Sequence, residues 1–265
     1  MITGFERLLT PLLNLSIHYL TQQVRVMGRI LHGGKSDVVR PTQHGFGRRL
    51  PKEEEKLEAR EAEVLRQLKI TWKKFEYAEA KHKENYKNIA AHLKGTRYSA
   101  KDVENFSLAL AEFQRETYFP EKAGFFLSAL INNSRDADFV IHTRHLSQRI
   151  DNLGYGNTKN ITVEGNAGYA VGYAMKGGTI TVNGNADFVL GFGMKGGAII
   201  VNGNAGSDIG WGMQGGAITV NGNAEAGVGD VMFGGEIHLN GKHKGLGNRI
   251  LGGKIYHKGK LIVDK

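Results

Sequence analysis

Residues 172–186 read Gly-Tyr-Ala-Met-Lys-Gly-Gly-Thr-Ile-Thr-Val-Asn-Gly-Asn-Ala, and residues 191–205 repeat this as Gly-Phe-Gly-Met-Lys-Gly-Gly-Ala-Ile-Ile-Val-Asn-Gly-Asn-Ala. The two stretches are 19 residues apart. The diglycine Gly177-Gly178 recurs with steps of 19, 19, 19 and 18 residues as far as Gly252-Gly253. A repeat this short cannot bury a core by itself, so successive repeats must stack on one another. The period therefore predicts a solenoid in the second half of the chain.

Residues of equivalent phase predict columns that run along this solenoid. Ile180 and Val182 alternate with polar residues, so each repeat should contain a short strand with one inward face. Methionines of one phase predict an internal column: Met175, Met194, Met213 and Met232, with Ile250 in the last repeat. Two sets of asparagines predict hydrogen-bonded ladders: Asn183, Asn202, Asn221 and Asn240, and Asn166, Asn185, Asn204 and Asn223.

Composition divides the chain of 265 residues into two regions. Only eight of its 37 glycines precede Asp151. We therefore predict an α+β multi-domain protein, with a helical region over 1–135 and a β-helix of about five to six turns over 136–265. The chain has no cysteine, which excludes disulfides and thiolate metal sites. It shows neither a long apolar run nor a signal-peptide pattern, so the expected location is the cytoplasm.

The first region shows helical periodicity interrupted by loops. We predict an amphipathic helix within 5–30, a basic loop over 32–50, helices over 51–94 and 100–118, and an apolar segment over 124–131. Ser99 is the predicted N-cap of the helix that follows Gly95. A continuous 51–94 helix would be about 65 Å long at 1.5 Å per residue, so a coiled coil, a hairpin arm or a break is expected. The 100–118 helix should pack antiparallel to it.

Two groups of residues are candidates for function. The corners of the repeats carry side chains that suit a partner surface or a planar ligand, or else packing against the helices: Tyr169, Tyr173, Phe188, Phe192, Asp208, Trp211, Asp230 and Arg249. A second group is a weak candidate for catalysis or metal binding: Asp136, Asp138, His142 and His145. We assign no catalytic, cofactor-binding or metal-ligating residue and expect no cofactor.

The unit Gly-x-x-Met-Lys-Gly-Gly-x-Ile-x-Val-x-Gly-Asn-Ala at 172–186 and 191–205 resembles the Gly-x-Gly-x-Gly β-helix family. This family includes one of the subunits of formylmethanofuran dehydrogenase and the C-terminal domain of the large chain of glutamate synthase. The resemblance covers about residues 161–265. It implies a right-handed parallel β-helix that serves as a scaffold in a larger redox or one-carbon assembly.

These observations predict a non-catalytic structural or scaffold protein whose partners are further copies of itself or other subunits. One alternative is an accessory subunit of a complex like formylmethanofuran dehydrogenase or glutamate synthase. Another is binding of nucleic acid or an anionic membrane surface through the basic N-terminal region, residues 1–50. Lysines and glutamates alternate between Glu76 and Glu84, which is typical of a solvated helix face and disfavours the nucleic-acid alternative.

Overall fold

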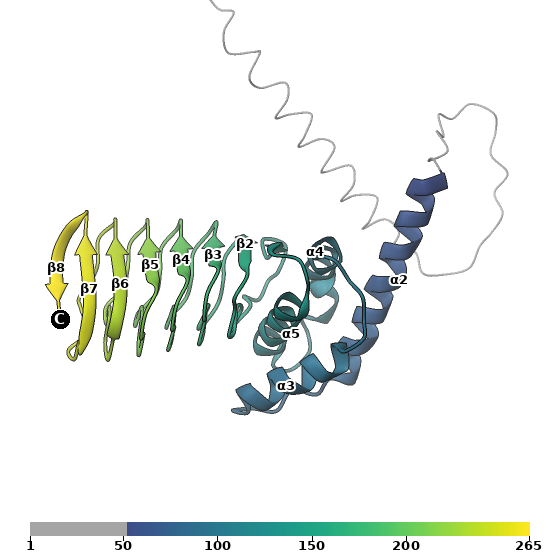
Figure 1. Ribbon diagram of the computed structural model, residues 1–265, viewed down its shortest axis with the longest axis horizontal. Helices are drawn as coiled ribbons and strands as arrows, with labels where there is room; N and C mark the ends of the chain where they lie inside the picture. Colours follow the sequence, from purple (N-terminus) through teal and green to yellow (C-terminus); the bar gives the residue numbers. More distant parts are fainter. Residues whose placement is uncertain (1–51) are drawn as a thin grey trace, which may run out of the picture. The chain divides into compact units, whose positions relative to one another are not determined.

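The computed structural model describes residues 52–265, which belong to one compact unit. The predicted amphipathic helix within 5–30 and the basic loop over 32–50 lie outside the described residues. In the described part, helices come first and strands follow (Figure 1). This order confirms the predicted class, a helical region followed by a parallel β-solenoid of about six turns with a period of about 19 residues.

The described part of the helical region, from residue 52 onward, contains four α-helices and one 3-10 helix. They are α2 (Lys52–Lys74), α3 (His82–Leu93), α4 (Ala100–Ala109), η1 (Leu110–Phe113) and α5 (Phe119–Asn133). The predicted 51–94 helix is therefore broken between Lys74 and His82. The buried Asn85 side chain holds this break, because it hydrogen bonds to both the N–H and the C=O of Ala78, at 3.0 and 2.7 Å. Ala80 adopts a left-handed conformation in the same turn, with φ of 58°.

The helix after Gly95 begins as predicted and ends earlier than predicted. Ser99 and Asp102 form a capping box, in which the Ser99 N–H donates to the Asp102 carboxylate at 2.8 Å. The expected 100–118 helix is α-helical only to Ala109 and continues as the 3-10 helix η1 to Phe113, and the left-handed Tyr118 is the N-cap of α5.

The expected antiparallel pairing of this helix with the long helix is wrong. Contacts between the two elements advance in the same direction along both. They are Arg60 with Asp102 at 3.2 Å, Lys69 with Glu112 at 2.6 Å, and Trp72 with Glu116 at 3.0 Å. Helices α2 and α4 thus run parallel, because α3 returns the chain before α4 begins.

One eight-stranded sheet, with its strands in chain order, forms the regular face of the solenoid. The strands are β1 (Asp138–His142), β2 (Asn160–Glu164), β3 (Thr179–Val182), β4 (Ala198–Val201), β5 (Ala217–Val220), β6 (Phe233–Leu239), β7 (Gly252–His257) and β8 (Lys260–Asp264). Strands β1 to β7 pair in parallel, and each inward isoleucine lies beside its equivalent, as Ile180 lies beside Ile199. The final strand β8 folds back antiparallel on β7.

The interior of the solenoid contains the predicted methionine column. Met175, Met194, Met213 and Met232 are fully buried. From Gly197 onward, the second glycine of each diglycine makes room for the methionine of the preceding turn. A Cβ on Gly197 would lie 2.8 Å from Met175 Cε and 2.6 Å from the Gly178 carbonyl oxygen. The backbone φ angle of Gly197 is +85°. This position therefore needs glycine both for the left-handed corner and for the space.

The two asparagine ladders form in different ways. In the first, the side-chain amides after Asn183 donate to the asparagine of the preceding turn, as Asn202 Nδ2 does to Asn183 Oδ1 at 2.8 Å, whereas Asn183 itself donates to Glu164. In the second, each side-chain oxygen accepts from a backbone N–H, as Asn185 Oδ1 does from Asn204 N at 2.8 Å. The second set therefore links side chains to the next backbone, where amide-to-amide bonds were predicted.

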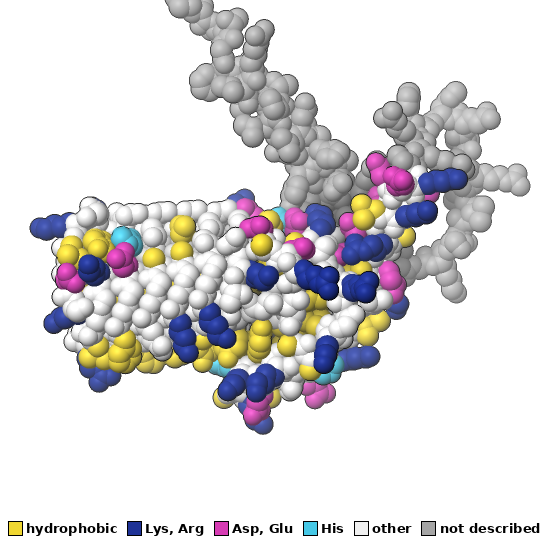
Figure 2. Space-filling model, in the orientation of Figure 1, with side chains coloured by type: hydrophobic (Ala, Val, Ile, Leu, Met, Phe, Trp, Pro, Cys, Tyr) yellow, Lys and Arg dark blue, Asp and Glu magenta, His cyan; other side chains and the backbone are white. Residues whose placement is uncertain are grey.

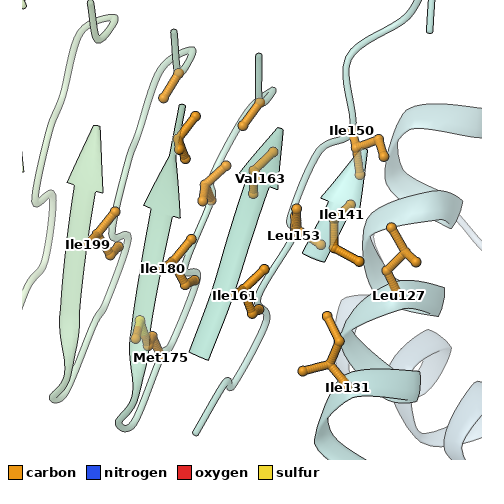
Figure 3. Packing of buried hydrophobic residues seen from close by; sticks show 14 of the residues in the cluster. Leu127, Ile131, Ile141, Ile150, Leu153, Ile161, Val163, Met175, Ile180 and Ile199 are labelled. Atoms are coloured by element: carbon orange, nitrogen blue, oxygen red, sulfur yellow. The ribbon is translucent and has the colours of Figure 1, made fainter. Parts of the chain in front are cut away.

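Helix α5 covers the first turn of the solenoid and shares its core. Leu127 and Ile131 of α5 lie beside Ile141 and Leu153 of the first turn (Figure 3). Ser128 Oγ accepts from the backbone N–H groups of Gly154 and Tyr155, at 2.9 and 3.1 Å. These bonds satisfy backbone groups that an uncovered end of the stack would expose. None of the described helices is long and apolar enough to span a bilayer.

Candidate partner-binding surface

A sharp corner in each turn presents one side chain to the outside of the solenoid. At 191–193 the two flanking glycines have φ of +71° and +56°, and equivalent left-handed pairs occur at 172–174 and 210–212. A Cβ on Gly191 would lie 2.5 Å from Ile218 Cδ1 of the next turn, so this glycine faces the core. The residue between the two left-handed positions remains half-buried or exposed. This residue is Tyr173, Phe192 or Trp211 in successive turns.

These corner residues stack into an aromatic ladder, which we define as Tyr155, Tyr173, Phe192 and Trp211. Ring centroids are 5.0 Å apart for Tyr155–Tyr173, 4.9 Å for Tyr173–Phe192 and 5.2 Å for Phe192–Trp211. The last two pairs are stacked, with interplanar angles of 30° and 21°. Both faces of the Phe192 ring are therefore occupied, which excludes a planar ligand from stacking there. Each pair adds about 0.5–1.5 kcal/mol beyond area burial.

The start of the ladder packs against the helical region. Tyr155 contacts Tyr86 of α3 and Phe125 of α5, each at a centroid distance of 5.2 Å. His82, at the first position of α3, lies edge-on to Tyr173 at 5.9 Å. Burial raises the pKa of the Tyr155 phenol, with smaller contributions from Tyr173 and Tyr86. The interpretation that corner aromatics pack on the helices thus applies to the first two rings.

The far end of the ladder and its neighbours are exposed. Figure 2 shows a strip of hydrophobic side chains along one edge of the solenoid. Exposed large aromatic residues of the solenoid come from three positions of the turn, and we call them together the ridge: Tyr169 and Phe188, Trp211, and Phe233. Trp211 is 40% exposed although one of its faces covers Phe192. Several exposed aromatic side chains in neighbouring turns are typical of a surface that binds a partner.

The charged corner residues serve the stack itself. Asp230 follows Trp211 in the same column, and its Oδ1 accepts from the backbone N–H of Arg249 at 2.9 Å. Asp208 does not continue the Tyr169–Phe188 column, because Ser207 occupies that place. Asp208 lies one residue further, with φ of 59°, and its carboxylate accepts from Ser207 Oγ at 3.1 Å. Arg249 is exposed in the last turn.

Asp151 is a perturbed carboxyl that the sequence pattern does not single out. Burial raises its pKa from 3.8 to about 6, and the nearby Glu121 and Asp187 carboxylates add to this shift. Its Oδ1 accepts from the Tyr169 N–H at 2.8 Å, which opposes the shift in part. Such shifts occur at functional sites, but here the side chain anchors the second turn of the stack.

The polar group at 136–145 does not form a single site. Asp136 Oδ2 accepts from the Ala100 N–H at 2.6 Å and so supports the start of α4, whereas Asp138 accepts from Asn160 at 2.9 Å. His142 Nε2 lies 2.9 Å from Glu104 of α4. Within residues 52–265 no group of three or more histidines and carboxylates is placed to hold a metal ion.

His145, the last member of that group, is half-buried and hydrogen bonds to the backbone of Leu108 in α4. Burial lowers its pKa, and the nearby His142 contributes a smaller effect in the same direction. Its buried Nε2 has no hydrogen-bond partner among the described residues. A half-buried imidazole that bonds to the backbone of α4 fits a structural role.

Tyr155 is the ladder residue that the repeat pattern did not predict, although a signal was present. Gly154-Tyr155-Gly156 has the same corner pattern as Gly191-Phe192-Gly193. It precedes Tyr173 by 18 residues, one fewer than the prevailing period, which separates it from the series.

No family model matches the chain, and comparison with curated proteins gives no match either. A proposal about its function therefore rests on the geometry of the surfaces described above.

Proposed function

We propose that the protein is a non-catalytic scaffold subunit that holds a partner protein against the ridge. The observation that carries this proposal is that large aromatic side chains are exposed on the solenoid. The corner carboxylates Asp208 and Asp230, in contrast, form hydrogen bonds within the fold. Aromatic residues contribute large contact areas at interfaces. The acidic and histidine side chains of the candidate polar group make separate structural contacts, which leaves no assembled catalytic centre among them to favour an enzyme.

The stack suits a scaffold because it keeps the ridge rigid. Backbone hydrogen bonds join each turn to the next, and the asparagine ladder adds side-chain bonds at the same spacing. A preorganised surface loses little conformational entropy on binding, so more of the contact energy appears as affinity. The partner is another copy of the chain or a different subunit of a complex.

The test compares complex formation by two variants that each lose exposed hydrophobic surface. Phe188 and Leu57 are 54% and 53% exposed, so replacing either with serine should disturb folding little. We expect Phe188→Ser/Phe233→Ser to weaken the native complex by at least about ten-fold, since hot-spot aromatics each contribute roughly 1–2 kcal/mol or more. Leu57→Ser on α2 should leave the complex intact. Native mass spectrometry of complexes isolated from cells measures whether each variant still forms the complex.

Retention of the complex in the ridge variant would contradict the role of the ridge. Turnover of a substrate by the isolated protein would contradict a non-catalytic role. A homo-oligomer and a mixed complex differ in the masses of the components released on dissociation, so the same measurement identifies the type of partner.

A second candidate is an accessory subunit of an oxidoreductase complex like formylmethanofuran dehydrogenase or glutamate synthase. The repeat unit at 172–186 favours it through its resemblance to those β-helices. Co-purification of subunits with flavin or iron–sulfur absorbance would support it. Binding of nucleic acid or membrane through residues 1–50 stays a prediction, because those residues lie outside the described part.

A further inference from the structure

Charge is distributed very unevenly along the solenoid. Residues 160–239, which we call the body of the solenoid, contain two basic and six acidic residues, a net formal charge of −4. Residues 240–265, which we call the tip, contain seven basic residues and one acidic residue, a net of +6. The basic residues of the tip are Lys242, Lys244, Arg249, Lys254, Lys258, Lys260 and Lys265. Stacking alone does not require this contrast, because the columns of the body are built from neutral residues.

The tip forms the end of the stack opposite the helices. It comprises the last turn and the β7–β8 hairpin, and strand β8 is the final strand of the sheet (Figure 1). Several lysine and arginine side chains project from this end of the solenoid (Figure 2). All seven are exposed, and among the described residues only Lys244 is within ion-pair distance of a carboxylate, that of Glu225. The positive charge is thus available to a partner.

Exposed aliphatic side chains lie among these lysines. Leu261 and Ile262 of β8 are 41% and 39% exposed, and both come directly after Lys260. The chain between β7 and β8 adds Lys258 beside them. Lysines on an edge strand guard against unwanted strand pairing, which accounts for the charge but not for two exposed aliphatic residues. Basic side chains around a small apolar patch are typical of surfaces that bind lipid headgroups and insert into the interface.

We infer that the tip is a docking site for the surface of an anionic lipid bilayer. The lysines attract acidic headgroups, and Leu261 and Ile262 enter the interfacial layer. The negative body of the solenoid is repelled by the same surface, so the protein binds end-on and leaves the ridge free. This activity goes beyond scaffolding and does not depend on it.

Two other anionic or apolar partners fit the tip less well. Nucleic-acid surfaces favour arginine forks and free aromatic faces, whereas the tip has one arginine, and its Tyr256 ring already stacks on His238 at 4.6 Å. A second copy docked tip to tip would bring two charges of +6 together. A bilayer that contains acidic lipid satisfies both the charge and the aliphatic residues.

The first experiment measures co-sedimentation of the full chain with phosphatidylcholine vesicles that contain about one-third phosphatidylserine. We expect binding that falls with salt and with removal of phosphatidylserine. Lys258→Glu/Lys260→Glu should lower the partition coefficient at least about ten-fold, since each lysine near the surface contributes roughly 1 kcal/mol. Lys176→Glu/Lys195→Glu makes the same charge change in exposed residues of the body and should reduce binding much less. Residues 1–51 are identical in all three proteins, so any binding through them cancels in the comparison.

The second experiment locates the contact and does not depend on charge changes. The chain has no cysteine, so Ile262→Cys or Phe188→Cys gives a single site for an environment-sensitive fluorophore. We expect a blue shift on vesicles for the label at 262 and none for the label at 188. The inference is overturned if the wild type does not bind these vesicles, if both lysine pairs have equal effects, or if the label at 188 shifts instead. Tighter binding to a DNA duplex than to the vesicles at the same salt would assign the tip to nucleic acid and also overturn it.

Discussion

At the scale of single residues, the presence or absence of a Cβ decides whether the turns can stack. In the first diglycine, a Cβ on Gly178 would overlap the carbonyl oxygen of Lys159 in the preceding turn, and φ at Gly178 is +71°. A Cβ on Gly177 would meet no atom within 4 Å. Two adjacent, identical residues therefore have different roles, and only the second is required by the fold.

We predict that Gly178→Ala lowers the free energy of unfolding by roughly 2–4 kcal/mol, because it combines a backbone clash with an unfavourable left-handed alanine. Gly177→Ala should change it by less than about 1 kcal/mol. Urea denaturation of both variants measures the difference. Equal destabilisation by the two substitutions would show that the stacking account of this corner is wrong.

Asp151 illustrates a residue whose charge opposes folding. Its pKa is about 6 in the folded protein, above the unfolded value of 3.8. The folded state therefore binds the proton more tightly, and the resulting stability is fully present below pH 3.8 and is lost as the pH rises through 6. Since the group is partly exposed, we take the loss as roughly 1–2 kcal/mol after solvent screening.

We predict that Asp151→Asn raises the melting temperature at pH 8 and changes it little at pH 4, where the native carboxyl is already protonated. The Asn side-chain oxygen can still accept from the Tyr169 N–H, so the anchor is preserved. Thermal unfolding at both pH values tests this. Asp138→Asn, at an exposed carboxylate on β1, is the control, and a similar pH-dependent gain there would contradict the explanation.

At the scale of elements, helix α5 connects the helices to the solenoid through a few polar side chains in an apolar interface. Gly124 brings the helix close to the chain at Asp151, because a Cβ there would overlap the Asp151 carbonyl oxygen. This close approach places Ser128 over the first turn, where it is buried and accepts from two backbone N–H groups. Asn132 adds a bond from its amide to the Tyr155 carbonyl oxygen at 3.0 Å.

We predict that Ser128→Ala costs about 1–3 kcal/mol, because it leaves the Gly154 N–H buried without its acceptor, whereas the Tyr155 N–H keeps the Asn152 carbonyl oxygen at 3.2 Å. Ser147→Ala is the control, since Ser147 Oγ donates to Gln114 on the exposed surface and its loss should cost less than about 1 kcal/mol. Chemical denaturation gives both values. Hydrogen exchange at Gly154 should increase only in the Ser128 variant.

At the scale of the whole molecule, regular repetition made most of the solenoid predictable. The inward residues, the methionine column and the first asparagine ladder each recur at the period of the turn, so one correct turn predicts its neighbours. The helical region lacks such a period. The break after Lys74 depends on hydrogen bonds from Asn85 to Ala78, and the parallel alignment of α2 and α4 depends on that break. Neither follows from helical periodicity alone.

The candidate site was predictable as a set of corner residues, but not as a surface. Tyr173 and Trp211 occupy equivalent corners, so their sequence contexts look alike. Tyr173 faces His82 of α3, whereas Trp211 lies two turns further along and is exposed. The partners that bury Tyr155 and Tyr173 come from residues more than about 25 positions earlier in the chain, beyond the reach of any local pattern.

The sequence by itself determined the stacked turns, because the spacing of glycine, asparagine and apolar residues matches the local geometry of each coil. Only the tertiary structure decided which aromatic rings are covered and which form the ridge, because coverage depends on how far helices α3 and α5 reach along the stack. The same holds for the tip. Its lysines are visible in the sequence, but the antiparallel return of β8 along β7, which places Leu261 and Ile262 on the last strand of the sheet, is a feature of the tertiary structure.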